Sequence, residues 1–61
     1  MARFKLRLLG KDGQVIGEKQ FNKTRNYEAI ELAEHLVQAE AGKWAGYELW
    51  RGERILRRHP K

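Results

Sequence analysis

The stretch Arg3-Phe4-Lys5-Leu6-Arg7-Leu8-Leu9 decides the fold, because basic and apolar residues alternate along it. Side chains of a β-strand point alternately to its two faces, so this period of two predicts a half-buried strand. We expect its apolar members to face a core and its basic members to face outward. The outer side of this strand is therefore where a functional surface is sought.

A tight turn follows this strand. The sequence Gly10-Lys11-Asp12-Gly13 contains Asp-Gly, a pair that favours the positive φ angles of a hairpin turn. With Asp12 and Gly13 as the two loop residues, apolar and polar positions agree on both faces. The predicted partners are Lys11 with Gln14, Leu9 with Ile16, Arg7 with Glu18, Lys5 with Gln20, and Phe4 with Phe21. A four-residue loop would shift the partners without exchanging the faces. We therefore predict a hairpin over residues 2–21.

Beyond Tyr27 the period of the apolar residues changes from two to that of a helix. The apolar positions are Ala29, Ile30, Ala33, Leu36, Val37 and Ala41. This spacing predicts an amphipathic helix over residues 26–41. Asn26 or Thr24 is expected to cap its first turn, and Gly42 is expected to end it.

A second hairpin is predicted over residues 47–58, because Gly52 at the first loop position suits a type II′ turn. The predicted partners are Trp50 with Ile55, Leu49 with Leu56, Glu48 with Arg57, and Tyr47 with Arg58. This register turns Leu49, Leu56 and Tyr47 toward the helix and leaves Glu48, Trp50, Ile55 and Arg57 outside. Residues 59–61 are expected to form a polar tail.

The predicted fold class is α+β. We expect one domain over residues 1–61, a two-layer ββαββ arrangement in which an antiparallel sheet of two hairpins carries one helix across one face. The strand order between the two hairpins is left open.

Two resemblances accompany this layout. Residues 46–54, Gly46-Tyr47-Glu48-Leu49-Trp50-Arg51-Gly52-Glu53-Arg54, follow the pattern G-x-E-x-W-x-G-x-R. The chain thereby resembles short uncharacterised bacterial ββαββ proteins with such a hairpin, which implies a self-contained small protein and brings no known chemistry. The layout also resembles a truncated ubiquitin-like β-grasp domain. The last strand and the Gly-Gly tail of that family are missing, so modifier activity is not implied.

The chain of 61 residues is near the lower practical size of a domain and can bury only a modest core. Covering a free sheet face or pairing an edge strand in a dimer would add stability. The absence of Cys excludes disulfides and thiolate metal sites. No apolar run is long enough to span a membrane, and the chain begins directly in strand pattern, so we expect a cytoplasmic protein without membrane attachment.

Residues suited to catalysis are scarce. The sequence has no Ser and no Cys, and Thr24 lies in a turn-like stretch. Glu31 and His35 share a helix face and could imitate an acid–base pair, but that face is expected to point to solvent, away from any pocket. His35 and His59 lie on different elements. We therefore expect no enzyme, no metal, no cofactor and no small-molecule substrate.

Charge is distributed unevenly along the chain. Residues 1–25 carry seven Lys or Arg against two acidic residues (+5), residues 26–42 carry four Glu and no base (−4), and residues 43–61 carry six bases against two acids (+4). A helix between two hairpins would then be acidic and the sheet basic, and such a field steers anionic partners to the sheet. Alternatively, the charges only keep a small domain in solution.

The predicted outer sheet face combines basic and apolar side chains, a composition typical of a binding surface. The residues predicted to contact a partner are Arg3, Lys5, Arg7, Leu9, Ile16, Trp50, Ile55 and Arg57. Glu18 and Glu48 are local counter-charges. In an alternative interpretation, strand order separates the apolar pairs and they only support the sheet.

Two functions follow from this predicted face. The leading hypothesis is self-association, as a homodimer, or docking on another protein, with Trp50 as the anchor, because Trp and Arg dominate binding energy at interfaces. The alternative is nucleic-acid binding, in which a base stacks on Trp50 and the arginines and lysines hold phosphates.

Overall fold

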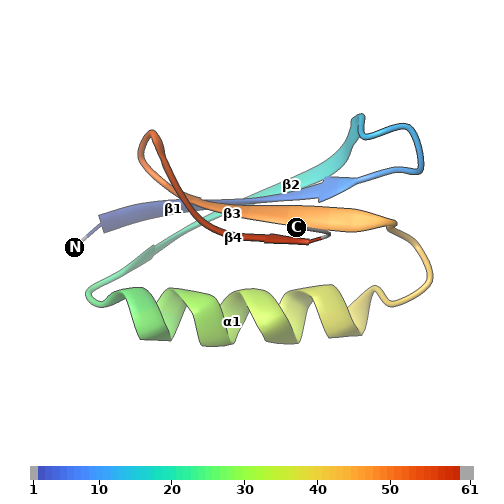
Figure 1. Cartoon of the computed structure of the whole chain (residues 1–61). Helices are drawn as coiled ribbons and strands as arrows, with labels where there is room; N and C mark the ends of the chain where they lie inside the picture. Colours follow the sequence, from blue (N-terminus) through green and yellow to red (C-terminus); the bar gives the residue numbers. More distant parts are fainter. Residues whose placement is uncertain (1, 60–61) are drawn as a thin grey trace.

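The computed structural model describes residues 2–59, which form a four-stranded antiparallel sheet with one helix across one face (Figure 1). In chain order the elements are β1 (Ala2–Leu9), β2 (Val15–Lys23), α1 (Asn26–Ala39), β3 (Gly46–Arg51) and β4 (Arg54–His59). The predicted ββαββ architecture is therefore confirmed. The strand order, which the sequence left open, is β2-β1-β3-β4.

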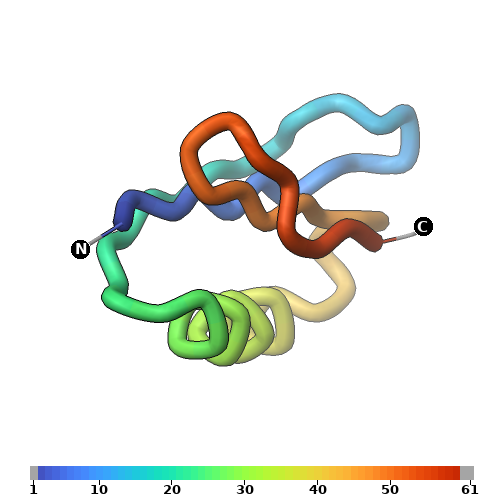
Figure 2. The backbone as a smooth tube through the Cα atoms, turned by 60° about the vertical axis from the view of Figure 1, so that its left-hand side comes forward, coloured from blue at the N-terminus to red at the C-terminus, as the bar shows by residue number. Residues whose placement is uncertain are grey.

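The alternating stretch forms an internal strand of the sheet. Both β2 and β3 pair with β1 in antiparallel sense, so β2 and β3 run parallel to each other with β1 between them. The helix α1 makes the connection from β2 to β3 and passes across β1. Figure 2 shows the resulting two layers, with α1 on one side and both hairpins on the other. One face of the sheet thus lies against α1 and the other is uncovered.

The core forms between α1 and the helix side of the sheet. Its buried residues are Phe4, Leu6 and Leu8 of β1, Leu49 of β3, and Ala29, Ala33 and Val37 of α1. The three helix residues are spaced four apart and lie on one stripe of α1. Each large aliphatic side chain buried here stabilises the fold by about 1.5–3 kcal/mol. The predicted inward orientation of the apolar residues of β1 is confirmed.

The register of the first hairpin is confirmed over most of its length and wrong near the turn. Phe4, Lys5 and Arg7 have the predicted partners, but Leu9 lies opposite Val15 and not Ile16. Ile16 is the extra residue of a β-bulge, which restores the predicted register at the next pair.

The cause of this difference is the length of the turn. The N–H of Gly10 donates to the carbonyl of Gln14 (2.8 Å), and the N–H of Gly13 donates to the carbonyl of Gly10 (2.9 Å). The loop therefore has three residues, Lys11 to Gly13, and Gly13 takes the left-handed conformation with φ of 81°. One more loop residue than predicted moves the register by one, and the bulge corrects it.

The second hairpin has the predicted turn but departs from the predicted register beyond Trp50. Gly52 has φ of 59° and Trp50 pairs with Ile55, as expected for the two-residue turn. Leu56 is the extra residue of a second bulge. Beyond it, Leu49 lies opposite Arg57, and the predicted pairs of Leu49, Glu48 and Tyr47 are all wrong by one residue.

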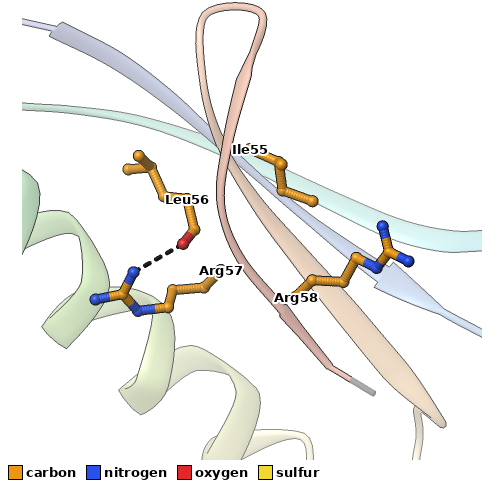
Figure 3. Close-up of a pocket in the computed structure, with 4 residues that line it drawn as sticks. All are labelled: Ile55, Leu56, Arg57 and Arg58. Atoms are coloured by element: carbon orange, nitrogen blue, oxygen red, sulfur yellow. Dashed lines mark hydrogen bonds between the residues drawn. The ribbon is translucent and has the colours of Figure 1, made fainter. Parts of the chain in front are cut away.

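This bulge changes the sides on which β4 residues lie. Figure 3 shows Leu56 and Arg57 on the helix side of β4, and Ile55 and Arg58 on the opposite side. The predicted outward position of Arg57 is therefore wrong, and Arg58 takes that place. The bulge keeps Leu56 partly buried against the core. It also brings Glu48 opposite Arg58, an opposite-charge pair.

The helix begins as predicted at Asn26, but its cap differs. Arg25 is the N-cap residue, and its N–H donates to the carboxylate of Glu28 (3.0 Å). Neither Asn26 nor Thr24 is the cap. The side-chain oxygen of Asn26 instead accepts a hydrogen bond from Nη1 of Arg51 (2.6 Å), which ties the start of α1 to the end of β3.

The helix ends at Ala39, two residues before its predicted end. Its backbone tightens there, because the N–H of Glu40 donates to the carbonyl of Val37 (3.3 Å) and that of Ala41 to Gln38 (3.2 Å). Gly42 then adopts φ of 89°, which reverses the chain direction at little steric cost.

Trp44 closes the end of the core next to the helix C-terminus. Its indole Nε1 donates to the carbonyl of Val37 (2.8 Å), and its ring lies edge-on to Tyr47 and His59. Tyr47 and His59 stack on each other with ring centroids 5.8 Å apart. His59 therefore belongs to β4, and the prediction that a tail begins there is wrong. Residues 60 and 61 of that predicted tail lie outside the described residues.

Replacing Leu6 by Ala tests the core. Leu6 is fully buried, so Leu6→Ala is expected to lower the free energy of unfolding by about 2–5 kcal/mol. This is a large part of the roughly 3–9 kcal/mol expected for a domain of this size. Urea unfolding followed by circular dichroism measures the change. The control is Ile16→Ala, at a side chain 50% exposed. Equal losses in the two variants would contradict the core assignment.

Candidate functional site

The face of the sheet opposite α1, called here the outer face, is uncovered (Figures 1 and 2). Its members follow from the alternation of side chains and the strand register. They are Arg3, Lys5, Arg7 and Leu9 of β1, Val15, Glu18, Gln20 and Asn22 of β2, Glu48 and Trp50 of β3, and Ile55 and Arg58 of β4. The outer face thus contains six of the eight residues predicted to contact a partner.

A row of alternating charge crosses the middle of the outer face. Glu18, Arg7, Glu48 and Arg58 lie opposite one another on the four successive strands, and we call them the charged row. Nε of Arg7 lies 3.3 Å from Oε2 of Glu18, and both side chains are more than one-third exposed. Solvent screening limits such a pair to about 0.2–1 kcal/mol. With two acids and two bases, the charged row is close to electrically neutral.

Trp50 is fixed by two members of the charged row. Its indole Nε1 donates to Oε1 of Glu48 (3.1 Å), and the guanidinium carbon of Arg7 lies 5.8 Å from its ring centre. The ring remains only partly buried. A partly exposed aromatic ring held by two neighbours loses little further freedom when a partner covers it.

A hollow of about 280 Å³ lies beside Trp50. Its lining residues are Lys5, Arg7, Trp50, Gly52 and Glu53. Ile55, directly opposite Trp50 on β4, is 37% exposed and extends the apolar surface. The turn residues Gly52 and Glu53 were not among the predicted contact residues, because their position depends on how β3 lies beside β1.

The apolar residues of this side of the sheet form two groups. Trp50 and Ile55 make one group, and Leu9 and Val15 make the other near the first turn. Arg7 and Glu48 of the charged row lie between them. The predicted Leu9 pair is replaced by Leu9 with Val15. The predicted outward position of Ile16 is wrong, because the bulge turns its side chain to the helix side of the sheet, where its Cγ2 lies 3.2 Å from the place of a Cβ on Gly10. The outer face therefore does not carry one contiguous apolar patch.

Two hollows outside the outer face are larger than the one beside Trp50. One, of about 500 Å³, follows the free edge of β4. Its lining residues point to opposite sides of the strand (Figure 3), so it is an open strand edge and not a concave site. The other, of about 340 Å³, lies between the end of β2 and α1, where Glu31 and His35 line it. Within residues 2–59, no three His, Cys, Asp or Glu side chains gather as a metal site.

Comparison with known proteins finds no matching protein family, no matching curated protein and no matching solved structure. In the described part of the chain, no helix is long and apolar enough to cross a membrane.

A double-mutant cycle tests the contact between Arg7 and Trp50. Arg7→Ala is expected to lower the free energy of unfolding by about 0.5–1.5 kcal/mol, because it loses both Glu18 and the indole ring. The coupling energy between Arg7→Ala and Trp50→Ala is expected to be about 0.5 kcal/mol. Urea unfolding of the two single variants and the double variant gives both values.

The matched control is Arg3→Ala, which removes the same charge from the same strand and face. Among the described residues Arg3 makes no side-chain hydrogen bond or ion pair, so its removal should change the stability by less than about 0.5 kcal/mol. Equal effects of Arg3→Ala and Arg7→Ala would show that Arg7 does not hold Trp50.

Proposed function

We propose that this chain is a small non-catalytic protein-binding module that docks another protein on its outer face around Trp50. The observation that carries the proposal is the fixed indole ring, bonded to Glu48, covered by Arg7 and set beside an open hollow. Aromatic and Arg side chains in such positions supply most of the binding energy of protein interfaces. The apolar surface of Ile55 extends the contact.

The charges of the outer face favour a different protein over a second copy at this position. The face carries four bases, Arg3, Lys5, Arg7 and Arg58, against two acids, Glu18 and Glu48. Stacking two such faces would bring like charges together and desolvate them. A partner surface with carboxylates for the bases and an apolar pocket or ridge for Trp50 meets no such cost.

Nucleic-acid binding is the second candidate, supported by two bases of this face, Arg3 and Lys5, that have no acidic partner among residues 2–59. Two observations favour protein docking over it. Glu48 places a carboxylate beside the indole, where a phosphate of a stacked nucleotide would lie, and Arg7 covers the ring. The charged row also interrupts the line of bases that a phosphate backbone would follow.

Binders selected from a displayed library of peptides and small domains test the proposal. The binders are selected against the purified wild-type chain. We expect Trp50→Ala to lower the affinity of the chain for these binders at least tenfold in calorimetric titration, because loss of a central Trp is costly. The matched control is Tyr27→Ala, which removes an aromatic ring 59% exposed in α1. It should change affinity less than about twofold.

Binders that are unaffected by Trp50→Ala would contradict the proposal. A titration with a mixed-sequence single-stranded oligonucleotide at low and moderate salt separates the second candidate. If the oligonucleotide binds with a steep loss of affinity as salt rises, and Trp50→Ala removes that binding, nucleic acid replaces protein as the partner.

A further inference from the structure

The two edges of the sheet differ in how open they are to another strand. The β2 edge is nine residues long and regular beyond its bulge at Ile16. The β4 edge is six residues long, is interrupted by the Leu56 bulge and carries three Arg. Short length, bulges and charge are the features that protect sheet edges from pairing. The β2 edge also has a bulge and carries Glu18, Lys19 and Lys23, but it is longer and offers an uninterrupted row of backbone groups beyond its bulge.

The backbone hydrogen bonds show which residues of β2 face its free edge. The carbonyls of Leu9 and Arg3 accept from the N–H groups of Ala45 and Gly52, at the β3 side of β1. Because N–H and C=O groups alternate between the two edges of a strand, the even-numbered residues of β1 face β2. Their partners in β2, the odd-numbered residues from Gly17 to Phe21, face back toward β1.

The residues whose backbone groups point to the free edge of β2 are Glu18, Gln20 and Asn22. Each presents a backbone N–H and C=O to the free edge of β2, in a regular row. The same alternation at β4 directs the backbone N–H and C=O groups of Ile55 and Arg58 to its free edge, with the bulge between them. There the Leu56 carbonyl already accepts from Nη1 of Arg57 (2.8 Å). The β2 edge is therefore the better template for an added strand.

We infer that a second copy of this chain pairs with the β2 edge, antiparallel and with the twofold axis at Gln20. Glu18 then lies opposite Asn22 of the second copy, and Gln20 lies opposite Gln20. Each such pair exchanges two backbone hydrogen bonds. Oε1 of Glu18, the oxygen not bonded to Arg7, can accept from the Asn22 amide of the second copy.

The charges of β2 select this register over its neighbours. With the axis at Gln20, Lys19 lies opposite Phe21, whose ring is partly exposed and can be covered by the lysine stem. An axis at Glu18 or at Lys19 would place each of these residues opposite itself. An axis at Phe21 would place Lys19 opposite Lys23. Like charges directly opposite are unfavourable, so only the Gln20 register avoids them among these four. An axis at Asn22 avoids them too, but it pairs only residues 21–23 of β2.

The dimer would be an eight-stranded sheet with both helices on one side and both outer faces on the other. It does not depend on the proposed docking function, but it would place two Trp50 sites on one surface and allow bivalent binding. A contact made by one strand edge is smaller than a standard interface. We therefore expect reversible association, with a dissociation constant on the order of 10–1,000 μM.

Charge variants at the axis test the register. Gln20→Lys and Gln20→Glu each place like charges opposite each other, so each variant alone should dimerise about two- to fivefold more weakly than the wild type. An equal mixture of the two should regain at least the wild-type association, because Lys then lies opposite Glu. Sedimentation equilibrium over a wide concentration range measures all three samples, with circular dichroism to verify folding.

Matched controls are Gln14→Lys and Gln14→Glu, which make the same changes directly after the turn of the same hairpin, outside the paired part of β2, and should leave association unchanged. Gln20→Pro should abolish dimerisation and preserve the fold, because this N–H does not bond to β1. A chain that stays monomeric at about 1 mM would overturn the inference. Association that is unchanged by the Gln20 variants would also overturn it. Loss of association on Trp50→Ala would overturn it too and would place self-association on the outer face instead.

Discussion

The burial of one side of β1 against α1 is the constraint on which the rest of the structure depends. Phe4, Leu6 and Leu8 are almost completely buried because β1 lies inside the sheet, with a strand along each edge and α1 across its face. The small side chains of Ala29 and Ala33 let the helix approach that strand closely. The same alternation that buries these residues sends Arg3, Lys5 and Arg7 to the uncovered face. Core and candidate site are therefore two sides of one strand.

The two bulges let each hairpin satisfy both its turn and this constraint. The Gly13 turn has one residue too many for the register in which Phe21 meets Phe4, and Ile16 absorbs the difference. In β4 the order Ile55-Leu56-Arg57-Arg58 cannot alternate cleanly between apolar and polar sides. The bulge at Leu56 resolves this by placing Leu56 and Arg57 on the helix side together. Both bulges lie on edge strands, where an unpaired residue disturbs one neighbour only.

Patterns with a short period were sufficient to predict the elements, and long-range pairing was not. The alternation of β1, the helical spacing from Ala29 and the Gly52 turn are local signals, and the elements that they predict are confirmed. The position of Arg57 was wrong because the order Ile55-Leu56-Arg57-Arg58 breaks the alternation but does not show which residue forms the bulge. The bond between Trp50 and Glu48 and the hollow near Gly52 depend on β3 lying beside β1. A single sequence does not encode that neighbour relation in any local pattern, so this part of the site required the structure.

The two proposed contacts lie on different parts of the sheet, with docking on the outer face and self-association along the β2 edge. The outer face is net basic, so a second copy would meet repulsion there, whereas a strand edge binds mainly through neutral N–H and C=O groups. On β2 those groups belong to Glu18, Gln20 and Asn22, whose side chains offer hydrogen bonds more than net charge. Pairing along this edge would leave the Trp50 hollow open, because the lining of that hollow belongs to β1, β3 and the turn after β3, and β2 itself lies between the hollow and the free edge. The fold can therefore support self-association and docking of another protein at the same time.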